Sequence, residues 1–426
     1  MESFMDSKSF SRRTFLSCSA LALGTAGQLP SLVASANQGN SERSFEKKVA
    51  GVVTIYRHNS HADVLLTKIL QGWKHDGGPG PQLELASLYV DQFPKDDMAV
   101  ALSKQFGFRL CDNIEQALTL DSSRLAVDGV LSIGEHGDYP YNDLGQHLYP
   151  RKRFFSEITQ VFEKCGQVVP VFNDKHPGPE WSDTMWMYNK AKELSIPWMA
   201  GSSAPVGFRK PDQTLPWGVG VQACVAIGYS GLDVYGIHTL EFMHSILERR
   251  NATEHGIAWV QNLPIQQALE YVNKGTIDRD LLQEALNCAE AGTIPFTTLF
   301  ANQEDKNRAM FLVGYADGLV VPVLMLAGNA KAITVAVRDV KGQRFATRFD
   351  ERVEPRYPHF ACLLKGVEKM VLTGRASYPV ERNIITAGAL DRLLRSGHEN
   401  HQRIETPELS ISYATVDYPY GSHIEL

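Results

Sequence analysis

The chain has 426 residues, 43% apolar and 21% charged, with a formal net charge of −6 at pH 7. This composition is typical of a soluble globular protein and excludes collagen-like and intrinsically disordered chains, while the length allows two domains of ordinary size. The mildly acidic balance argues against nucleic acid or an anionic membrane surface as a partner.

The first segment has the pattern of an export signal. A paired arginine at 12–13 precedes a short apolar run rich in small residues, which ends at an A-x-A site at 34–36. This pattern is typical of a twin-arginine signal peptide, so we expect residues 1–36 to direct export to the periplasm and residues 37–48 to form a linker. The run is too short and polar for an anchor, and no later segment offers ~20 consecutive apolar residues. We therefore expect no stable membrane insertion.

Cysteine usage gives no sign of a disulfide framework. Six cysteines lie far apart, at positions 18, 111, 165, 224, 288 and 362, and none forms a C-x-x-C pair. Loss of the signal peptide would leave an odd number, so at least one would stay unpaired.

From residue 49 to residue 212 the chain alternates strand-like and helical segments. Apolar, β-rich runs stand at 49–56, 83–90, 127–133 and 167–172. Near-continuous apolar strands that alternate with helices predict a parallel sheet covered on both faces. We therefore predict a Rossmann-like domain over residues 49–212.

The first helix of this domain is the best specified. Ser60 and Asp63 fit a capping box at its start, and a Gly/Pro-rich loop at 75–82 follows it. One face carries the apolar residues Ala62, Leu65, Leu66, Ile69 and Trp73 at helical spacing.

The pattern changes beyond residue 212. Helical stretches at 240–250 and 265–290 precede two pairs of strand-like runs, joined at 317–318 (Asp-Gly) and at 341–342 (Lys-Gly). Such dipeptides between apolar runs are hairpin signals. Residues 213–426 are therefore predicted to form a second α/β domain, with an antiparallel sheet and helices on one side.

Polar side chains follow each strand-like run of the first domain. They are Tyr56, Arg57, His58 and Asn59 after the first run, Asp91 after the second, Glu135 and His136 after the third, and Asp174, Lys175 and His176 after the fourth. Each cluster alone also suits a solvated loop. Because ligands of an open parallel sheet bind outside the carboxyl ends of its strands, the clusters together predict a binding site at that edge.

Four collinear passages resemble the Gfo/Idh/MocA oxidoreductase family. The segment VFNDKHP at 171–177 is similar to the family's strand-end E-K-P segment, and 111–130 is similar to its short helix and VDAV strand. YGIHTLE at 235–241 looks like the G-x-H-x-x-D segment, and 363–397 resembles the closing pair of helices. The similarity spans nearly the whole chain after the signal peptide.

The resemblance implies a Rossmann domain followed by an α/β domain with a large, mainly antiparallel open sheet, and hydride transfer between NAD or NADP and a sugar or polyol. It places Lys175 and His238 as the catalytic lysine and histidine, which polarise and deprotonate the reacting hydroxyl. Asp174, His176 and Glu241 would contact the substrate. The open sheet commonly packs on a second copy, and the strands at 311–340 are apolar enough to need cover. A homo-oligomer, either a dimer or a tetramer, is therefore expected.

The phosphate-binding turn departs from the family pattern. G-x-G-x-x-G would fall at 56–61, where this chain reads Y-R-H-N-S-H, with only His61 in a familiar place. Those glycines let the backbone approach the pyrophosphate, so this turn cannot hold a dinucleotide in the usual manner. Side-chain cations at the helix N-terminus could replace them. The predicted cofactor-binding residues are Tyr56, Arg57, His58, Asn59, Asp91, Glu135 and His136.

The leading interpretation is an exported oxidoreductase that acts on a sugar or polyol with tightly bound NAD(P), since the periplasm offers no nicotinamide pool. A cofactor-free carbohydrate-binding or scaffold protein on the same fold is the alternative that the lost glycines favour. A metal-assisted sugar lyase or hydrolase is a third, using His238, Glu241 and His244. Residues i and i+6 diverge around a helix, so we assign no metal site.

Overall fold

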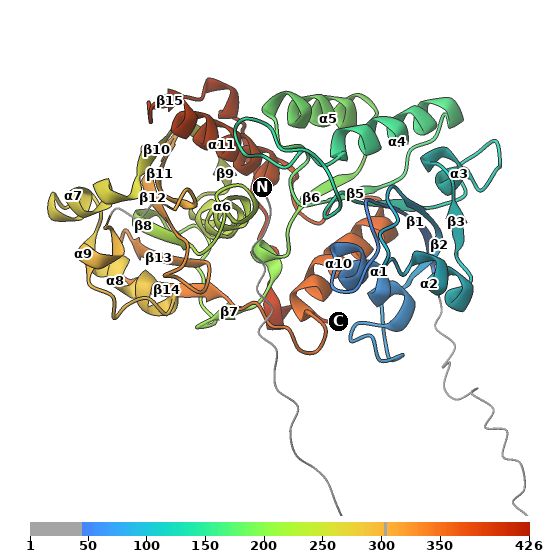
Figure 1. Ribbon diagram of the computed structural model, residues 1–426, viewed down its shortest axis with the longest axis horizontal. Coiled ribbons are helices and arrows are strands. Elements are labelled where there is room, and N and C mark those ends of the chain that lie inside the picture. Colours follow the sequence, from blue (N-terminus) through green and yellow to red (C-terminus); the bar gives the residue numbers. More distant parts are fainter. Residues whose placement is uncertain (1–44, 302–304) are drawn as a thin grey trace, which may run out of the picture. The chain divides into compact units, whose positions relative to one another are not determined.

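The computed structural model describes residues 45–301 and 305–426 (Figure 1). The predicted signal peptide and most of the predicted linker lie outside these residues. Within the described ranges, no helix has the length and apolar character needed to cross a bilayer.

The predicted parallel sheet is confirmed. Among residues 45–301, six parallel strands form it in the order β3-β2-β1-β4-β5-β6. These strands are β1 (Lys47–Val53), β2 (Leu83–Val90), β3 (Arg109–Cys111), β4 (Gly129–Ile133), β5 (Val171–Asp174) and β6 (Trp198–Gly201). The helices between them are α1 (His61–Gln71), α2 (Ala99–Phe106), α3 (Ile114–Thr119), α4 (Arg151–Cys165) and α5 (Trp181–Glu193). The strand order reverses between β1 and β4, and the crevice at this point is where such sheets bind ligands.

Helix α1 begins at the predicted cap. Ser60 Oγ accepts the backbone N–H of Asp63 at 3.3 Å, which satisfies one of the free donors of the first turn. Leu65, Leu66 and Ile69 are buried against the sheet. The predicted apolar face of this helix therefore forms the core on that side.

The second sheet contains eight strands of the described chain, in the order β15-β10-β11-β12-β8-β13-β14-β7. They are β7 (Arg209–Lys210), β8 (Val221–Gly228), β10 (Ile257–Pro264), β11 (Arg308–Tyr315), β12 (Val320–Leu326), β13 (Thr334–Asp339), β14 (Arg344–Phe349) and β15 (Ile404–Glu405). β12 pairs with β8 in parallel, and the other pairs are antiparallel. Both predicted hairpins are confirmed, as β11–β12 and β13–β14. A short ladder joins β9 (Thr253–Glu254) to β16 (Tyr413–Ala414).

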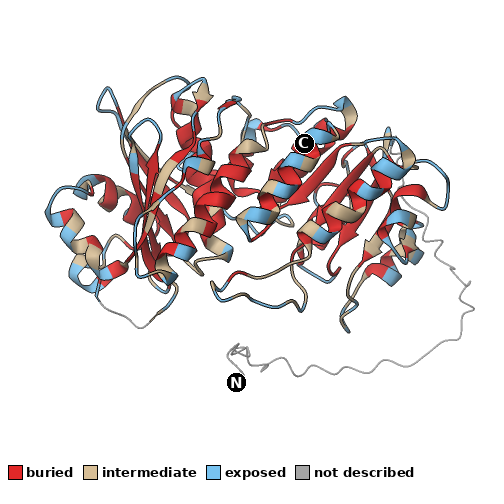
Figure 2. Cartoon of the chain, turned by 90° about the horizontal axis from the view of Figure 1, so that it is seen from above, coloured by how far each residue is buried: buried red, intermediate tan, exposed pale blue. Residues whose placement is uncertain are grey.

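Helices cover both faces of this sheet, so the prediction of helices on one side is wrong. Helices α6 (Val234–Leu247) and α11 (Glu381–His398) pack on one face, and α7 (Ala268–Asn273), α8 (Arg279–Cys288) and α9 (Phe296–Leu299) pack on the other. Val323 of β12 faces α6, whereas Leu324 faces α8. Figure 2 shows the strands of this sheet buried between helices. The apolar strands are thus covered by helices of the same chain, and the expected homo-oligomer, which the resemblance also implies, stays a prediction.

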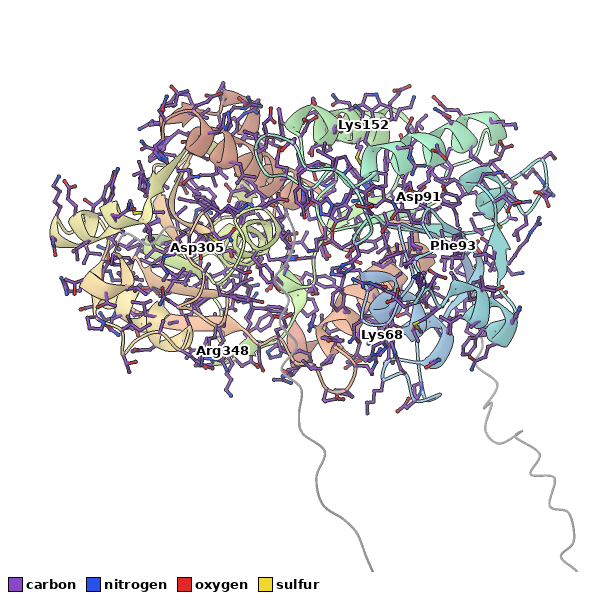
Figure 3. All side chains as sticks on the ribbon, in the orientation of Figure 1. Lys68, Asp91, Phe93, Lys152, Asp305 and Arg348 are labelled. Carbon is purple, nitrogen blue, oxygen red and sulfur yellow. The ribbon has the colours of Figure 1, made fainter. Side chains whose placement is uncertain are left out.

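Helix α10 (Pro358–Thr373) returns to the first sheet, although it belongs to the range predicted for the second domain. It packs beside α1 (Figure 1). The buried ammonium of Lys68 on α1 (labelled in Figure 3) donates to the carbonyl of Arg356, just before α10, at 2.6 Å. Burial and the nearby Arg356 lower the pKa of Lys68 to about 8. This contact brings the loop before α10 to the carboxyl edge of the first sheet.

Candidate functional site

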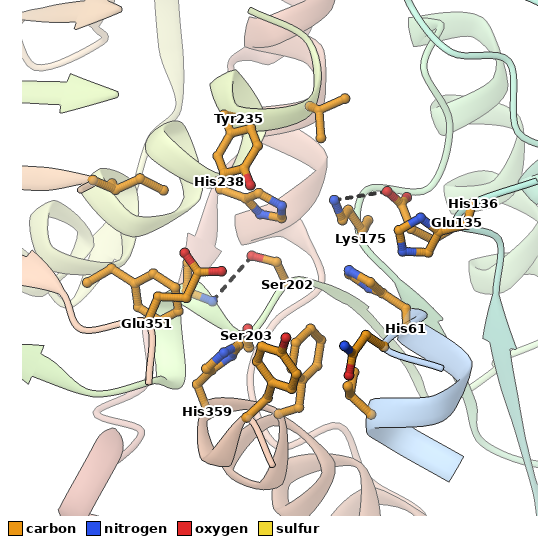
Figure 4. A pocket seen from close by; sticks show the side chains of 18 of the residues that line it. His61, Glu135, His136, Lys175, Ser202, Ser203, Tyr235, His238, Glu351 and His359 are labelled. Atoms are coloured by element: carbon orange, nitrogen blue, oxygen red, sulfur yellow. Dashed lines mark hydrogen bonds and ion pairs between the residues drawn. The ribbon is translucent and has the colours of Figure 1, made fainter. Parts of the chain in front are cut away.

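A cavity of about 270 Å³, here called the central pocket, lies at the carboxyl edge of the first sheet (Figure 4). Helix α6 and the loop between β14 and α10 complete its wall. Its polar lining is Asn59, His61, Glu135, His136, Lys175, Ser202, Ser203, Tyr229, Tyr235, His238, Glu351, Tyr357 and His359. Among the predicted site residues, the pocket therefore brings together Lys175, His238, Glu135, His136 and Asn59.

Lys175 follows β5 directly and is held on two sides. Its backbone takes the left-handed conformation, with φ 65°, and pairs with Gly201 at the end of β6. Its Nζ lies 3.1 Å from Glu135 Oε1, and both side chains are 5% exposed. The Arg151 guanidinium donates to the other oxygen of Glu135 at 2.7 Å. A buried carboxylate thus fixes the lysine ammonium at the pocket wall.

Glu135 stays ionised despite its burial. Burial alone would raise its pKa, but Lys175 and Arg151 hold the pKa well below the usual value. These two cations satisfy its carboxylate. Glu135 therefore positions Lys175, and its surroundings do not support the predicted role in cofactor binding.

His238 projects from α6 into the pocket, with the Tyr235 ring edge-on at 5.9 Å. Burial and the neighbouring Lys175 lower the pKa of His238. The ring is therefore neutral near pH 7 and can accept a proton. Its Nδ1 lies 3.7 Å from Glu241 Oε2, beyond hydrogen-bond distance.

Three residues predicted to touch substrate lie behind the pocket wall. Glu241 accepts the N–H of Ser202 at 3.1 Å and the Asn383 amide at 2.6 Å. Asp174 is fully buried against His61, and His176 lies 3.3 Å from Arg151. None of the three lines the central pocket, because the buried partners of each draw its side chain away. The prediction of direct substrate contact is therefore corrected to support of the groups in front.

In the turn predicted to bind the cofactor, residues 56–59, the side chains do not all face the pocket as expected. Tyr56 is fully buried, with its hydroxyl 2.8 Å from Thr67 Oγ1, so its side chain cannot reach a ligand. Arg57 and His58 are exposed, and Arg57 Nη1 stands 3.9 Å from Asp96. Asn59 lines the pocket in the left-handed conformation, φ 60°, which asparagine tolerates well.

The carboxylate of Asp91 (labelled in Figure 3) is bonded to protein side chains. Its carboxylate accepts the hydroxyls of Tyr89 and Tyr139, each at 2.7 Å, and a bond from Arg153. Because these protein donors occupy both oxygens, the predicted role of Asp91 in ribose binding is not supported by its surroundings.

A second groove of about 470 Å³ lies at the carboxyl ends of β1, β2 and β4, where Rossmann folds hold adenosine. It is lined by Ile55, Arg57, Gln92, Phe93, Pro94, Gly137 and Asp138. Lys175 in the central pocket and the residues of this groove lie along one strand-end edge, so they would hold the two ends of a nicotinamide dinucleotide. His136 Nε2 in the central pocket is buried and unpartnered within the described residues, and it suits a polar group of such a ligand. Phosphates would meet the side chains of Arg57 and His58 instead of glycine backbone.

The helical trio proposed for a metal does not converge. His244 is fully buried, and its two ring nitrogens lie 3.0 Å from the hydroxyls of Tyr315 and Tyr413. It therefore points into the core, away from His238. In residues 45–301 and 305–426, no group of three or more His, Cys, Asp or Glu side chains is arranged to hold a metal.

Several pocket residues were not predicted from the sequence. Ser202 and Ser203 follow β6, a strand of four residues that the apolar pattern did not reveal. The rule used for the other strand ends would have found them had that strand been recognised. Glu351, Tyr357 and His359 come from the β14–α10 connection, and no sequence signal links it to the first sheet.

Acidification is expected to destabilise the protein through its buried histidines. Burial lowers the pKa of His244 to about 4 and that of His359 to about 3, against about 6.5 when unfolded. Their stabilising contribution is complete above pH 6.5 and is lost as pH falls toward the folded pKa, because the unfolded state binds more protons. Each histidine should cost about 1.4 kcal/mol per pH unit in this range. Urea unfolding of His244→Gln should show a shallower dependence between pH 6.5 and 4.5, and slopes equal to those of the unchanged protein would contradict this account.

Comparison with known proteins shows similarity of fold. No protein-family model and no curated sequence matches the chain. GenD2 from gentamicin A biosynthesis, solved with NAD, superposes over 89% of this chain and 99% of its own, with TM-score 0.53 and 12% identity. Scyllo-inositol dehydrogenase from Lactobacillus casei covers 85% and 98%, with TM-score 0.53 and 9% identity. A myo-inositol dehydrogenase from Corynebacterium glutamicum covers 84% and 98%, with TM-score 0.52 and 11% identity.

These neighbours define the fold class. The architecture is that of Gfo/Idh/MocA-type inositol and sugar dehydrogenases, so the resemblance predicted from the sequence is confirmed at the level of the fold.

Proposed function

We propose that this chain is a periplasmic oxidoreductase that acts on a sugar or polyol with tightly held NAD(P). The observation that carries the proposal is the placement of Lys175 and His238. They come from β5 and α6, far apart in sequence, and both reach into one pocket on a dehydrogenase fold. The neighbours named above include an NAD complex and inositol dehydrogenases, which supports this class of cofactor and substrate.

The two residues have complementary roles in such a reaction. The nicotinamide ring, when bound, supplies the hydride acceptor or donor. His238 is neutral and takes the proton of the substrate hydroxyl. Lys175 places its ammonium beside the same oxygen and stabilises the negative charge that develops there, while Glu135 holds that ammonium in place.

The measurement that tests this proposal is the release of a dinucleotide. Full-length protein retained in the cytoplasm is purified, denatured and analysed by mass spectrometry. We expect about one NAD or NADP per chain, and the mass decides between the two. Absence of a dinucleotide, with no binding when either is added back, would contradict the redox function. Arg57→Ala should lower the dinucleotide content, and Arg109→Ala on an exposed edge is the matched control.

A second candidate is a cofactor-free carbohydrate-binding protein on the same fold, and a specific observation favours it. Thr54 Oγ1 donates to the carbonyl of Glu135 at 2.6 Å and accepts its N–H at 3.2 Å. This pair of bonds joins the ends of β1 and β4 at the crevice where a dinucleotide normally crosses. The N–H groups of Tyr56 and Asn59 are also used, by Asp97 and Asp63. Calorimetry with sugars and inositols on protein free of dinucleotide distinguishes this candidate, since binding without any cofactor would favour it.

Export and assembly remain predictions. Replacement of the arginine pair at 12–13 by lysines is expected to retain the protein in the cytoplasm.

Sedimentation at micromolar concentration tests the expected dimer or tetramer, and a monomer would contradict it.

A further inference from the structure

His61 and Asp174 form a hydrogen-bonded pair at the wall of the central pocket. Asp174 ends β5 and its side chain is 0% exposed, while its Oδ2 lies 2.6 Å from Nδ1 of His61 on α1. A carboxylate on Nδ1 fixes the ring tautomer and stabilises the imidazolium that forms when the other nitrogen takes a proton. In the part of the chain that the structure describes, no protein group bonds to His61 Nε2. The pair thus has the arrangement of a general base at the wall of a pocket.

The pair faces the groups assigned to hydride transfer. Figure 4 shows His61 reaching from α1 into the pocket that Lys175 and His238 enter from β5 and α6. The ring of His61 is held in place, edge-on to His136 at 5.3 Å and to Phe360 at 5.0 Å. Oxidation of a hydroxyl needs one base at the oxygen, and His238 supplies it. A second oriented base in the same pocket has no part in that step.

We propose that His61 is a catalytic residue that transfers a proton at the carbon next to a carbonyl of the bound sugar, with Asp174 as its positioning residue. His61 Nε2 takes the proton from that carbon. The electron pair of the broken C–H bond forms a C=C bond, and the carbonyl π pair moves to the oxygen, beside the Lys175 ammonium. Return of the proton regenerates the ketone, so neither oxidant nor reductant is consumed. The proposal rests on the proposed sugar or polyol substrate class but not on the cofactor.

The titratable groups that face His61 come from several elements of the fold. They are Asp174 on β5, Glu135 and His136 after β4, Lys175, His238 on α6 and His359 on α10. Burial lowers the pKa of His136 to about 4 and that of His359 to about 3, so both rings are neutral at pH 7. Glu135 remains ionised between its two cations.

The test is proton exchange in deuterated water, with the monoketone of myo-inositol and a six-carbon ketose as probes. The full-length protein should replace the hydrogen next to the carbonyl by deuterium, seen as loss of its proton NMR signal. His61→Gln should slow exchange by about 10²- to 10⁴-fold. His255→Gln, an exposed histidine that lines neither the central pocket nor the second groove, is the matched control and should exchange at the original rate. Added imidazole should restore part of the exchange to His61→Ala.

Asp174→Asn separates catalysis from folding. Loss of the carboxylate should lower kcat for exchange with little change in KM for the probe, and Asp174→Glu should restore part of kcat, whereas a structural role would change KM and the unfolding midpoint as well. Bound probes that exchange no faster than in buffer would overturn the proposal even if a dinucleotide is found. Exchange without any dinucleotide would sustain it and remove the redox function instead. Failure of every probe to bind would overturn both.

Discussion

Lys175→Ala is expected to lower kcat for sugar or polyol oxidation by about 10²- to 10⁴-fold, the usual range for loss of a positioned proton-transfer or charge-stabilising group. Lys175 brings the ammonium that lies at the pocket wall 3.1 Å from Glu135. Its removal leaves Glu135 paired with Arg151, so the carboxylate does not become an isolated buried charge. Steady-state kinetics at pH 7 measure the effect, and KM should change less than kcat.

Two comparisons make this result specific to the pocket. Lys152→Ala removes a half-exposed lysine that pairs with Asp183 on the outer helices, and it should leave turnover unchanged. Lys175→Arg keeps the charge but alters its position, so partial activity is expected. Unchanged turnover in Lys175→Ala would remove the lysine from the catalytic machinery.

Arg151→Met is expected to destabilise the fold by about 3–5 kcal/mol, the range seen when one partner of a buried ion pair is removed. The Arg151 side chain is 2% exposed and donates both to Glu135 and, at 2.9 Å, to the carbonyl of Gly134. Methionine fills much of the volume but satisfies neither acceptor. Urea unfolding at pH 7 should show a lower midpoint with an unchanged slope.

The matched control for this loss is Arg109→Met. Arg109 pairs with Asp121 at an exposed edge of the first sheet, where solvent screens the pair, so no measurable change in midpoint is expected. Equal midpoints for both variants would show that the buried pair adds no more stability than the exposed one. A lower activity of Arg151→Met, measured well below its unfolding midpoint, would indicate that Glu135 no longer holds Lys175 in place.

The predictions that succeeded came from local patterns. The period of the apolar residues predicted α1, the capping box of Ser60 and Asp63 predicted its start, and turn dipeptides at Asp317 and Lys341 predicted both hairpins. Strand-end residues reached one edge because all carboxyl ends of a parallel sheet meet there. Strands β3 and β6 were not predicted, because they have only three and four residues and, unlike β5, no longer apolar β-rich run was recognised around them.

The sequence by itself determined the alternation of strands and helices in the first domain, the two hairpins and the position of the strand-end clusters, because these depend on residues close together in the chain. The order of four passages along the chain indicated the dehydrogenase-like fold. Tertiary structure alone decided which side chains face the pocket. Tyr56 turns into the core, Glu241 turns toward Asn383, and His61 meets Asp174 across 113 positions of sequence. Such directions follow from long-range packing and from the need of each buried polar group for a partner, and no local period encodes them.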